Sequence, residues 1–178
     1  MNGVKGVLFD LNQTLVNSRL VETLRDQGQW EEVYRKIPEC SLYPGVSEII
    51  KDLQSADWKI GIVTSSPRQY AEKIIQHFDL QCDTLKAFHD TKMNKPHPEP
   101  YIDALKEMNV KRAFAWAIGD KQDDIDAANT LGIVSIYARW GNFAPSGALI
   151  SPDDICQKYD LCFDRPRELG KFLLQKQN

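Results

Sequence analysis

Four short polar segments of the chain each begin where an apolar run ends, and together they carry the groups that phosphate transfer requires. Asp10 follows the first apolar run, and a carboxylate there could attack phosphorus and form an aspartyl-phosphate. Thr64 or Ser65 offers a hydroxyl group for a phosphoryl oxygen, and Lys95 offers a cation for the charge on the phosphate and the nucleophile. The segments, in chain order, are residues 10–15, 64–66, 95–96 and 119–124.

The fourth segment is rich in carboxylates that could bind Mg²⁺. Asp120 and Asp124 lie before and within the start of an expected helix, with Asp123 between them. Oxygen ligands of this kind suit Mg²⁺. The metal and Lys95 together would offset the repulsion between an anionic nucleophile and an anionic phosphoryl group. The structural alternative is that these carboxylates favour a helix N-terminus, but the occurrence of all four segments in this order favours the catalytic interpretation.

The apolar pattern predicts the elements that must position these side chains. Short apolar runs alternate with stretches in which apolar residues recur at three- and four-residue steps, which indicates strands alternating with helices. This alternation predicts an α/β fold, a Rossmann-like parallel sheet covered by helices on both faces. Ligands bind such sheets beyond the carboxyl ends of the strands, where all four segments fall. The expected strands are residues 4–9, 59–63, 85–88, 113–118 and 134–137, and the expected helices include residues 46–53, 101–108, 123–131 and 167–174.

A further helix is expected directly after the second segment. Ser66 is a candidate N-cap for this helix, and Pro67 suits its first turn because proline has no N–H to leave unpaired. Apolar residues from Tyr70 to Phe78 form one face behind this cap. Ser66 is therefore predicted to have a structural role beside the phosphate site.

One stretch does not fit the alternation. Residues 17–41 predict two short helices that are broken near Gly28, and the stretch is too short to form a core of its own. We therefore expect a core domain made of residues 1–16 and 42–178, and a minimal helical cap insert at residues 17–41.

Composition and charge narrow the class of protein. The chain has 178 residues, of which 42% are hydrophobic and 26% charged, and its net charge of −3 argues against nucleic-acid binding through a basic surface. The first apolar run is too short for a signal peptide and no apolar stretch is long enough to span a membrane, so a cytoplasmic location is expected. The four cysteines lack the spacing of a zinc site and are expected to be reduced thiols.

The four segments resemble the motifs of the haloacid dehalogenase-like (HAD) hydrolase superfamily, over about residues 4–141. The Tyr43-Pro44-Gly45 and Arg139-Trp140-Gly141 tripeptides also resemble its phosphoglycolate phosphatase-like branch. The insert at residues 17–41 would correspond to the helical cap of this superfamily in a much shortened form. A short cap implies an open site, suited to a bulky substrate or to a partner subunit that covers it. The implied partner is a small phosphorylated substrate or a phosphorylated macromolecule, and the oligomeric state stays open.

The resemblance assigns roles to individual residues. It implies that Asp10 is the nucleophile and that Thr64 and Lys95 bind the phosphate, with Ser65 beside them. It also implies a Mg²⁺ site. The implied metal ligands are Asp10, the backbone carbonyl of Asn12, Asp120 and Asp124.

Asn12 departs from the superfamily pattern. Phosphatases of the superfamily have an aspartate there, which protonates the leaving group and then activates water. An asparagine side chain can neither give nor accept a proton at neutral pH, and general acid–base catalysis typically contributes about 10²–10⁴-fold to the rate. The backbone carbonyl at position 12 survives the change, so Mg²⁺ binding need not be lost.

Three interpretations follow. The first is a Mg²⁺-dependent phosphatase that acts through an aspartyl-phosphate on Asp10 and is slow or limited to good leaving groups. The second is a non-catalytic relative that binds a phosphorylated ligand or a protein. The third is a dehalogenase, a class that has tyrosine at the position of Asn12 and needs no metal. It ranks last because the chain keeps the metal carboxylates and has lost most of the cap that would enclose a small haloacid. The sequence favours the first, and for the substrate it offers only side chains that could reach it, namely Arg19, Arg68, Arg139 and Trp140.

Overall fold

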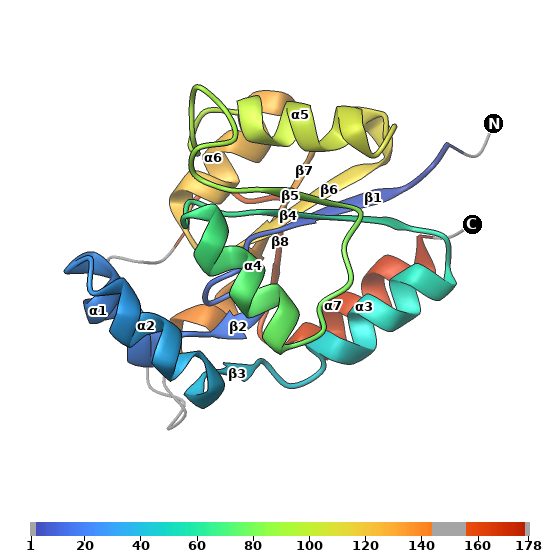
Figure 1. Ribbon diagram of the computed structural model, residues 1–178. Helices are drawn as coiled ribbons and strands as arrows, with labels where there is room; N and C mark the ends of the chain where they lie inside the picture. Colours follow the sequence, from blue (N-terminus) through green and yellow to red (C-terminus); the bar gives the residue numbers. More distant parts are fainter. Residues whose placement is uncertain (1–2, 144–155, 177–178) are drawn as a thin grey trace.

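A parallel sheet of six strands forms the centre of the computed structural model, which describes residues 3–143 and 156–176 (Figure 1). The strand order is β5-β4-β1-β6-β7-β8, and every neighbouring pair is parallel. The predicted Rossmann-like α/β fold is confirmed. The strands are β1 (Gly6–Phe9), β4 (Lys59–Val63), β5 (Thr84–Lys86), β6 (Ala115–Gly119), β7 (Val134–Ala138) and β8 (Leu161–Phe163).

Strand β1 lies between β4 and β6, and its side chains alternate between the two faces of the sheet. Val7 and Phe9 point into one hydrophobic core and Leu8 into the other, and all three are almost completely buried. This period of two is the geometry of any β-strand. A central strand covered on both faces therefore reads as a continuous apolar run, which is the pattern that predicted it.

Helices cover both faces of the sheet (Figure 1). Apolar residues of α3, α4 and α7 share one core with Val7 and Phe9, and those of α5 and α6 share the other with Leu8. Both layers hold the sheet rigid, so the polar segments at its carboxyl edge are fixed in relation to one another. The helices are α3 (Val46–Ser55), α4 (Arg68–His77), α5 (Glu99–Glu107), α6 (Gln122–Leu131) and α7 (Pro166–Gln175).

Helix α4 begins at Arg68, one residue later than predicted, so the prediction that Pro67 lies in its first turn is wrong. Pro67 occupies the N-cap position and makes no side-chain cap hydrogen bond, so the predicted N-cap role of Ser66 is also wrong. The Ser66 hydroxyl instead accepts a hydrogen bond from Asn12 Nδ2 at 2.8 Å. A side-chain partner from the first segment thus competes successfully with the helix terminus for this hydroxyl group.

The insert contains the two expected helices, α1 (Glu22–Asp26) and α2 (Trp30–Lys36), separated by a turn in which Gly28 has a φ of 67°. Short 3₁₀ turns flank them at Arg19–Val21 and Ile37–Glu39. Strands β2 (Val16–Asn17) and β3 (Ser41–Leu42) pair antiparallel at its base. Val21, Val33 and Ile37 are buried in the same core as Phe9, so the insert packs as part of the main body. The division into a core at 1–16 and 42–178 and an insert at 17–41 remains a prediction.

The described residues also bear on two expectations from composition. All four cysteines are free thiols, as predicted. Among residues 3–143 and 156–176, no helix has the length and apolar character needed to cross a membrane.

Leu8 offers a test of the central packing. Its side chain is fully buried and lies over Gly61 of the neighbouring strand, where a Cβ atom would collide with it. Leu8→Ala should lower the free energy of unfolding by about 2–5 kcal/mol, because it removes buried apolar surface and leaves a cavity. Urea denaturation followed by circular dichroism measures this loss. Val4→Ala is the control, since Val4 is 46% exposed; equal losses in both variants would contradict the packing described.

Candidate active site

The four polar segments meet at the carboxyl edge of the sheet. Asp10 directly follows β1, Thr64 follows β4 and Asp120 follows β6, while Lys95 comes from the loop before α5. Because β1 is hydrogen-bonded to both β4 and β6, the ends of these three strands are neighbours. One carboxylate oxygen from each of Asp10, Asp120 and Asp124 lies within 4.8 Å of the other two.

Lys95 is bound to two of these carboxylates. Its Nζ donates to Asp10 Oδ1 at 2.7 Å, to Asp124 Oδ1 at 2.5 Å and to the Val63 carbonyl at 2.8 Å. Burial alone lowers the pKa of Lys95, but the carboxylates of Asp10 and Asp124 outweigh it and hold that pKa well above its ordinary value. The ammonium therefore stays charged and satisfies its three donors inside the protein.

The carboxylates are strained electrostatically. Burial, and then the charges of Asp10 and Asp124, raise the pKa of Asp120 well above its ordinary value of 3.8. Burial also raises the pKa of Asp124, to about 6, although the Lys95 ammonium opposes this shift. Three ionised carboxylates and one ammonium would leave two negative charges in the cluster. An all-oxygen donor set with this charge fits a divalent cation such as Mg²⁺.

Local structure fixes the orientation of Asp120 and Asp124. The Thr14 hydroxyl donates to Asp120 Oδ1 at 3.1 Å. Asp124 uses one oxygen for Lys95 and accepts a hydrogen bond from the Lys121 backbone N–H on the other, at 3.1 Å, at the start of α6. Gly119 is required here because a Cβ atom on it would collide with the Asp124 carboxyl group.

The segment after β7 supports the turn that follows Asp10. Trp140 donates its indole N–H to the Thr14 carbonyl at 2.9 Å, and Arg19 donates to the Gly141 carbonyl. Gly141 lies so close to the Gln13 carbonyl that any side chain would collide with it. Trp140 and Gly141, singled out in the sequence, therefore pack against the first segment.

Asn12 is held by three hydroxyl groups. Its Oδ1 accepts hydrogen bonds from Ser18 and from Tyr70, both at 2.8 Å, and its Nδ2 donates to Ser66 at 2.8 Å. The amide thus has a fixed orientation, set by the insert and by α4. Gln13 follows with a φ of 59°, in the left-handed region, and its side chain is buried, with Oε1 accepting a hydrogen bond from the Tyr43 hydroxyl at 3.3 Å.

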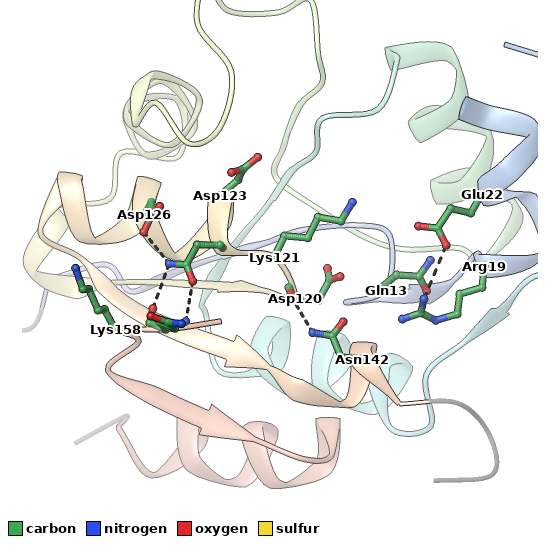
Figure 2. Close-up of a pocket in the computed structure, with 11 residues that line it drawn as sticks. Gln13, Arg19, Glu22, Asp120, Lys121, Asp123, Asp126, Asn142 and Lys158 are labelled. Carbon is green, nitrogen blue, oxygen red and sulfur yellow. Dashed lines mark hydrogen bonds and ion pairs between the residues drawn. The ribbon is translucent and has the colours of Figure 1, made fainter. Parts of the chain in front are cut away.

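Two cavities adjoin the cluster. The smaller, of about 140 Å³, is lined by Asp10, Thr64, Ser65 and Lys95, and on its other side by Glu22 and Arg25 of the insert. The larger, of about 600 Å³, is lined by Asp120 and Asn142 and, from the insert, by Arg19 and Glu22 (Figure 2). Helix α1 therefore forms part of the wall of both cavities.

The structure brings all the predicted site residues to this edge but separates some of the other candidates. Asp10, Asn12, Thr64, Ser65, Lys95 and Asp124 line the smaller cavity, and Asp120 lines the adjoining one. Arg68 forms ion pairs with Glu72 and Asp90, and Arg139 with Asp164, and neither lines these cavities. Sequence reasoning missed Ser18, Arg25 and Tyr70 because no local motif marks them. Ser18 and Tyr70 reach Asn12, and Arg25 reaches Ser18 and Tyr70, only through the packing of the insert against α4.

The fold and the buried acid–lysine cluster define an α/β protein with a charged site at the ends of its strands. The model of the haloacid dehalogenase-like hydrolase family matches residues 19–138, more than half of the chain, and the chain belongs to this family. The match begins after Asp10 and Asn12, so it does not include the first segment.

The chain is also similar to individual proteins in sequence and in fold. The chain is 30% identical over 136 residues to N-acetylmuramic acid 6-phosphate phosphatase of Pseudomonas putida, covering 74% of this chain and 58% of that protein. It is 32% identical over 100 residues to pyrophosphatase PpaX of Bacillus cereus, covering 55% and 46%. The chain spans about half the length of these curated relatives. A HAD phosphatase from Thermococcus onnurineus shares the fold, with a TM-score of 0.77, 19% identity and coverage of 96% and 98%.

The strained carboxylates predict an unusual stability effect. With metal removed by a chelator at about pH 7.5, Asp120→Asn should raise the melting temperature, because it removes one of three mutually repelling buried charges, and each kcal/mol gained gives about 2–4 °C. The asparagine carbonyl can still accept the Thr14 hydrogen bond.

The gain should shrink at about pH 5, where the raised pKa values of Asp120 and Asp124 already leave the cluster partly protonated. Differential scanning fluorimetry measures the melting temperatures of the parent chain and the variant at each pH. Asp126→Asn, at an exposed position of helix α6, serves as the control. A lower melting temperature in Asp120→Asn at the higher pH would contradict the electrostatic account.

Proposed function

We propose that this protein is a Mg²⁺-dependent phosphatase that acts through an aspartyl-phosphate on Asp10, with Asn12 in place of the usual acid and base. The observation that carries the proposal is the cluster in which Lys95 joins Asp10 to Asp124, with Asp120 close by. A nucleophilic carboxylate, a cation for the phosphate and a carboxylate set for a divalent metal then occupy one cavity edge.

The chemistry of the first step follows from these groups. Asp10, hydrogen-bonded to the Lys95 ammonium, attacks phosphorus, so that a bond from its carboxylate oxygen to phosphorus forms as the bond to the leaving group breaks. Thr64 and Ser65 supply hydroxyl groups at the cavity wall for the phosphoryl oxygens. Asp10, Asp120, Asp124 and the backbone carbonyl of Asn12 would hold Mg²⁺, which when bound neutralises charge on the phosphoryl group.

Asn12 limits both steps. In the first step the leaving group must depart as an anion, because the amide has no proton to donate. In the second step water must attack the aspartyl-phosphate without a base at this position. Good leaving groups, such as those of acyl phosphates, phosphoanhydrides and aryl phosphates, are therefore favoured. The relatives named N-acetylmuramic acid 6-phosphate phosphatase and pyrophosphatase PpaX support a small phosphorylated substrate.

A binding protein for a phosphorylated ligand is the second candidate, and the loss of the acid at position 12 is the observation in its favour. Three hydroxyl groups hold the Asn12 amide in one orientation. A site that only binds its ligand can keep this orientation, because it needs no proton transfer at position 12. The retained cluster of Lys95, Asp120 and Asp124 favours catalysis over this alternative. The same carboxylates argue against a metal-independent dehalogenase.

Leaving-group dependence tests the proposal. The chain should release p-nitrophenol from p-nitrophenyl phosphate only with Mg²⁺, and Asp10→Asn should abolish this turnover. Asn12→Asp should raise kcat/KM, which reports the first step, by up to about 10²–10⁴-fold for glycerol phosphate, which has a poor leaving group. It should raise kcat/KM for p-nitrophenyl phosphate by much less. Steady-state kinetics on both esters measure the two ratios.

The outcomes separate the two candidates. Turnover by Asn12→Asp but not by the parent chain would favour the binding protein. An equal gain in kcat/KM on both esters would show that position 12 does not act on the leaving group. No turnover by either protein would contradict the phosphatase proposal.

The pH dependence of Mg²⁺ binding gives a further prediction. Burial raises the pKa of Asp124 to about 6, so between its ordinary value of 3.8 and about 6 the folded protein holds a proton that the unfolded chain releases. The stabilising contribution of Asp124 is thus complete at low pH and is lost as the pH rises through 6. Mg²⁺ should restore stability there, so its melting-temperature gain should be larger at about pH 7.5 than at about pH 5. Asp120→Asn should reduce the gain, and a gain independent of pH would contradict carboxylate binding.

A further inference from the structure

Arg25 of helix α1 is a cation of the small cavity that the proposed mechanism leaves without a role. It lines the same cavity as Asp10, Thr64 and Lys95, on the wall that the insert provides. Its guanidinium lies over the ring of Tyr70, 5.2 Å from the ring centroid, which holds it in place from α4.

No ion pair among the described residues involves Arg25. Glu22, three residues earlier on the same helix, pairs with Arg19 at 3.8 Å. Lys95, another cation of the cavity, is already bound to two carboxylates. Arg25 thus presents a charged group, half-buried and without a carboxylate partner among the residues described, to the cavity that holds the nucleophile.

Arg25 is also connected to Asn12. Its NH1 approaches the Ser18 hydroxyl at 3.4 Å, and that hydroxyl donates to Asn12 Oδ1 at 2.8 Å. The guanidinium therefore lies on the Asn12 side of the cavity, and the proposed mechanism places the leaving group on that side. A fixed positive charge there stabilises negative charge on a departing oxygen without donating a proton.

We propose that Arg25 binds an anionic leaving group, and that the substrates of this site are phosphoanhydrides whose leaving group is itself a phosphate. The planar guanidinium matches phosphate oxygens with paired N–H donors. Such a leaving group departs as an anion and needs no acid, so the cation of Arg25 and the amide of Asn12 suit the same substrate. This inference rests on the proposed function, because it places the transferred phosphoryl group at Asp10.

Binding of imidodiphosphate, a diphosphate that resists hydrolysis, tests the proposal without turnover. Isothermal titration calorimetry with Mg²⁺ present should show that Arg25→Gln weakens imidodiphosphate binding by about 10- to 100-fold, as expected for the loss of a charged hydrogen-bonding partner. Binding of inorganic phosphate, which needs only the Lys95 side of the cavity, should change by less than about threefold. Arg25→Lys, which keeps the charge and the contact with Tyr70, should lie between.

The ratio kcat/KM tests the same role of Arg25 during turnover. Arg25→Gln should lower kcat/KM for inorganic pyrophosphate by about 10- to 100-fold and that for p-nitrophenyl phosphate far less. Arg35→Gln is the control, because Arg35 lies in the same insert, pairs with Glu32 on the surface and lines neither cavity; it should match the parent chain in both assays.

The outcomes distinguish this inference from the proposed function. Selective loss of imidodiphosphate binding in Arg25→Gln supports the diphosphate site even if no ester is hydrolysed, in which case only the phosphatase proposal fails. Equal binding of imidodiphosphate by the parent chain and Arg25→Gln, or no binding by the parent chain, overturns the role of Arg25. Equal losses for inorganic phosphate and imidodiphosphate also overturn it, because they indicate a general defect of the cavity.

Discussion

The buried ammonium of Lys95 is the interaction on which the site depends. It joins Asp10 at the end of β1, the Val63 carbonyl at the end of β4 and Asp124 on α6, at 2.5–2.8 Å. Three carboxylates without this cation would repel one another in a space that excludes most water. With Lys95 present, the carboxylates still outnumber the cation. Burial and the neighbouring carboxylates therefore raise the pKa values of Asp120 and Asp124. This oxygen donor set with excess negative charge favours a divalent cation.

The short insert contacts Asn12 and lines the same cavity. The amide cannot transfer a proton, yet it is oriented by hydroxyl groups from the insert and from α4. The insert also brings Arg25 to the cavity wall. A fixed charge can assist a leaving group that departs as an anion, whereas an alkoxide would need a proton. Under the proposed function, these groups favour phosphoryl transfer from substrates whose leaving group is already stable as an anion, followed by slow hydrolysis of the aspartyl-phosphate.

The sequence predicted those features that depend on local pattern. Buried parallel strands read as continuous apolar runs, so β1, β4, β6 and β7 were located within about two residues, and parallel topology placed Asp10, Thr64 and Asp120 at one edge. It failed where long-range contacts compete with local ones: Ser66 resembles a helix cap, but its hydroxyl accepts from Asn12. It could not find Arg25 or Tyr70, because their positions depend on how the insert packs against α4.

The most direct test of the central claim is detection of phosphate on Asp10 itself. The chain is incubated with acetyl phosphate and Mg²⁺, quenched in acid and analysed by peptide mass spectrometry. Because Asn12 cannot activate water, the account predicts that the peptide containing Asp10 gains the mass of one phosphoryl group, and that Asn12→Asp shows less of this adduct because it hydrolyses faster. Absence of the adduct in both proteins, or an adduct that persists in Asp10→Asn, would contradict the assignment of Asp10 as the nucleophile.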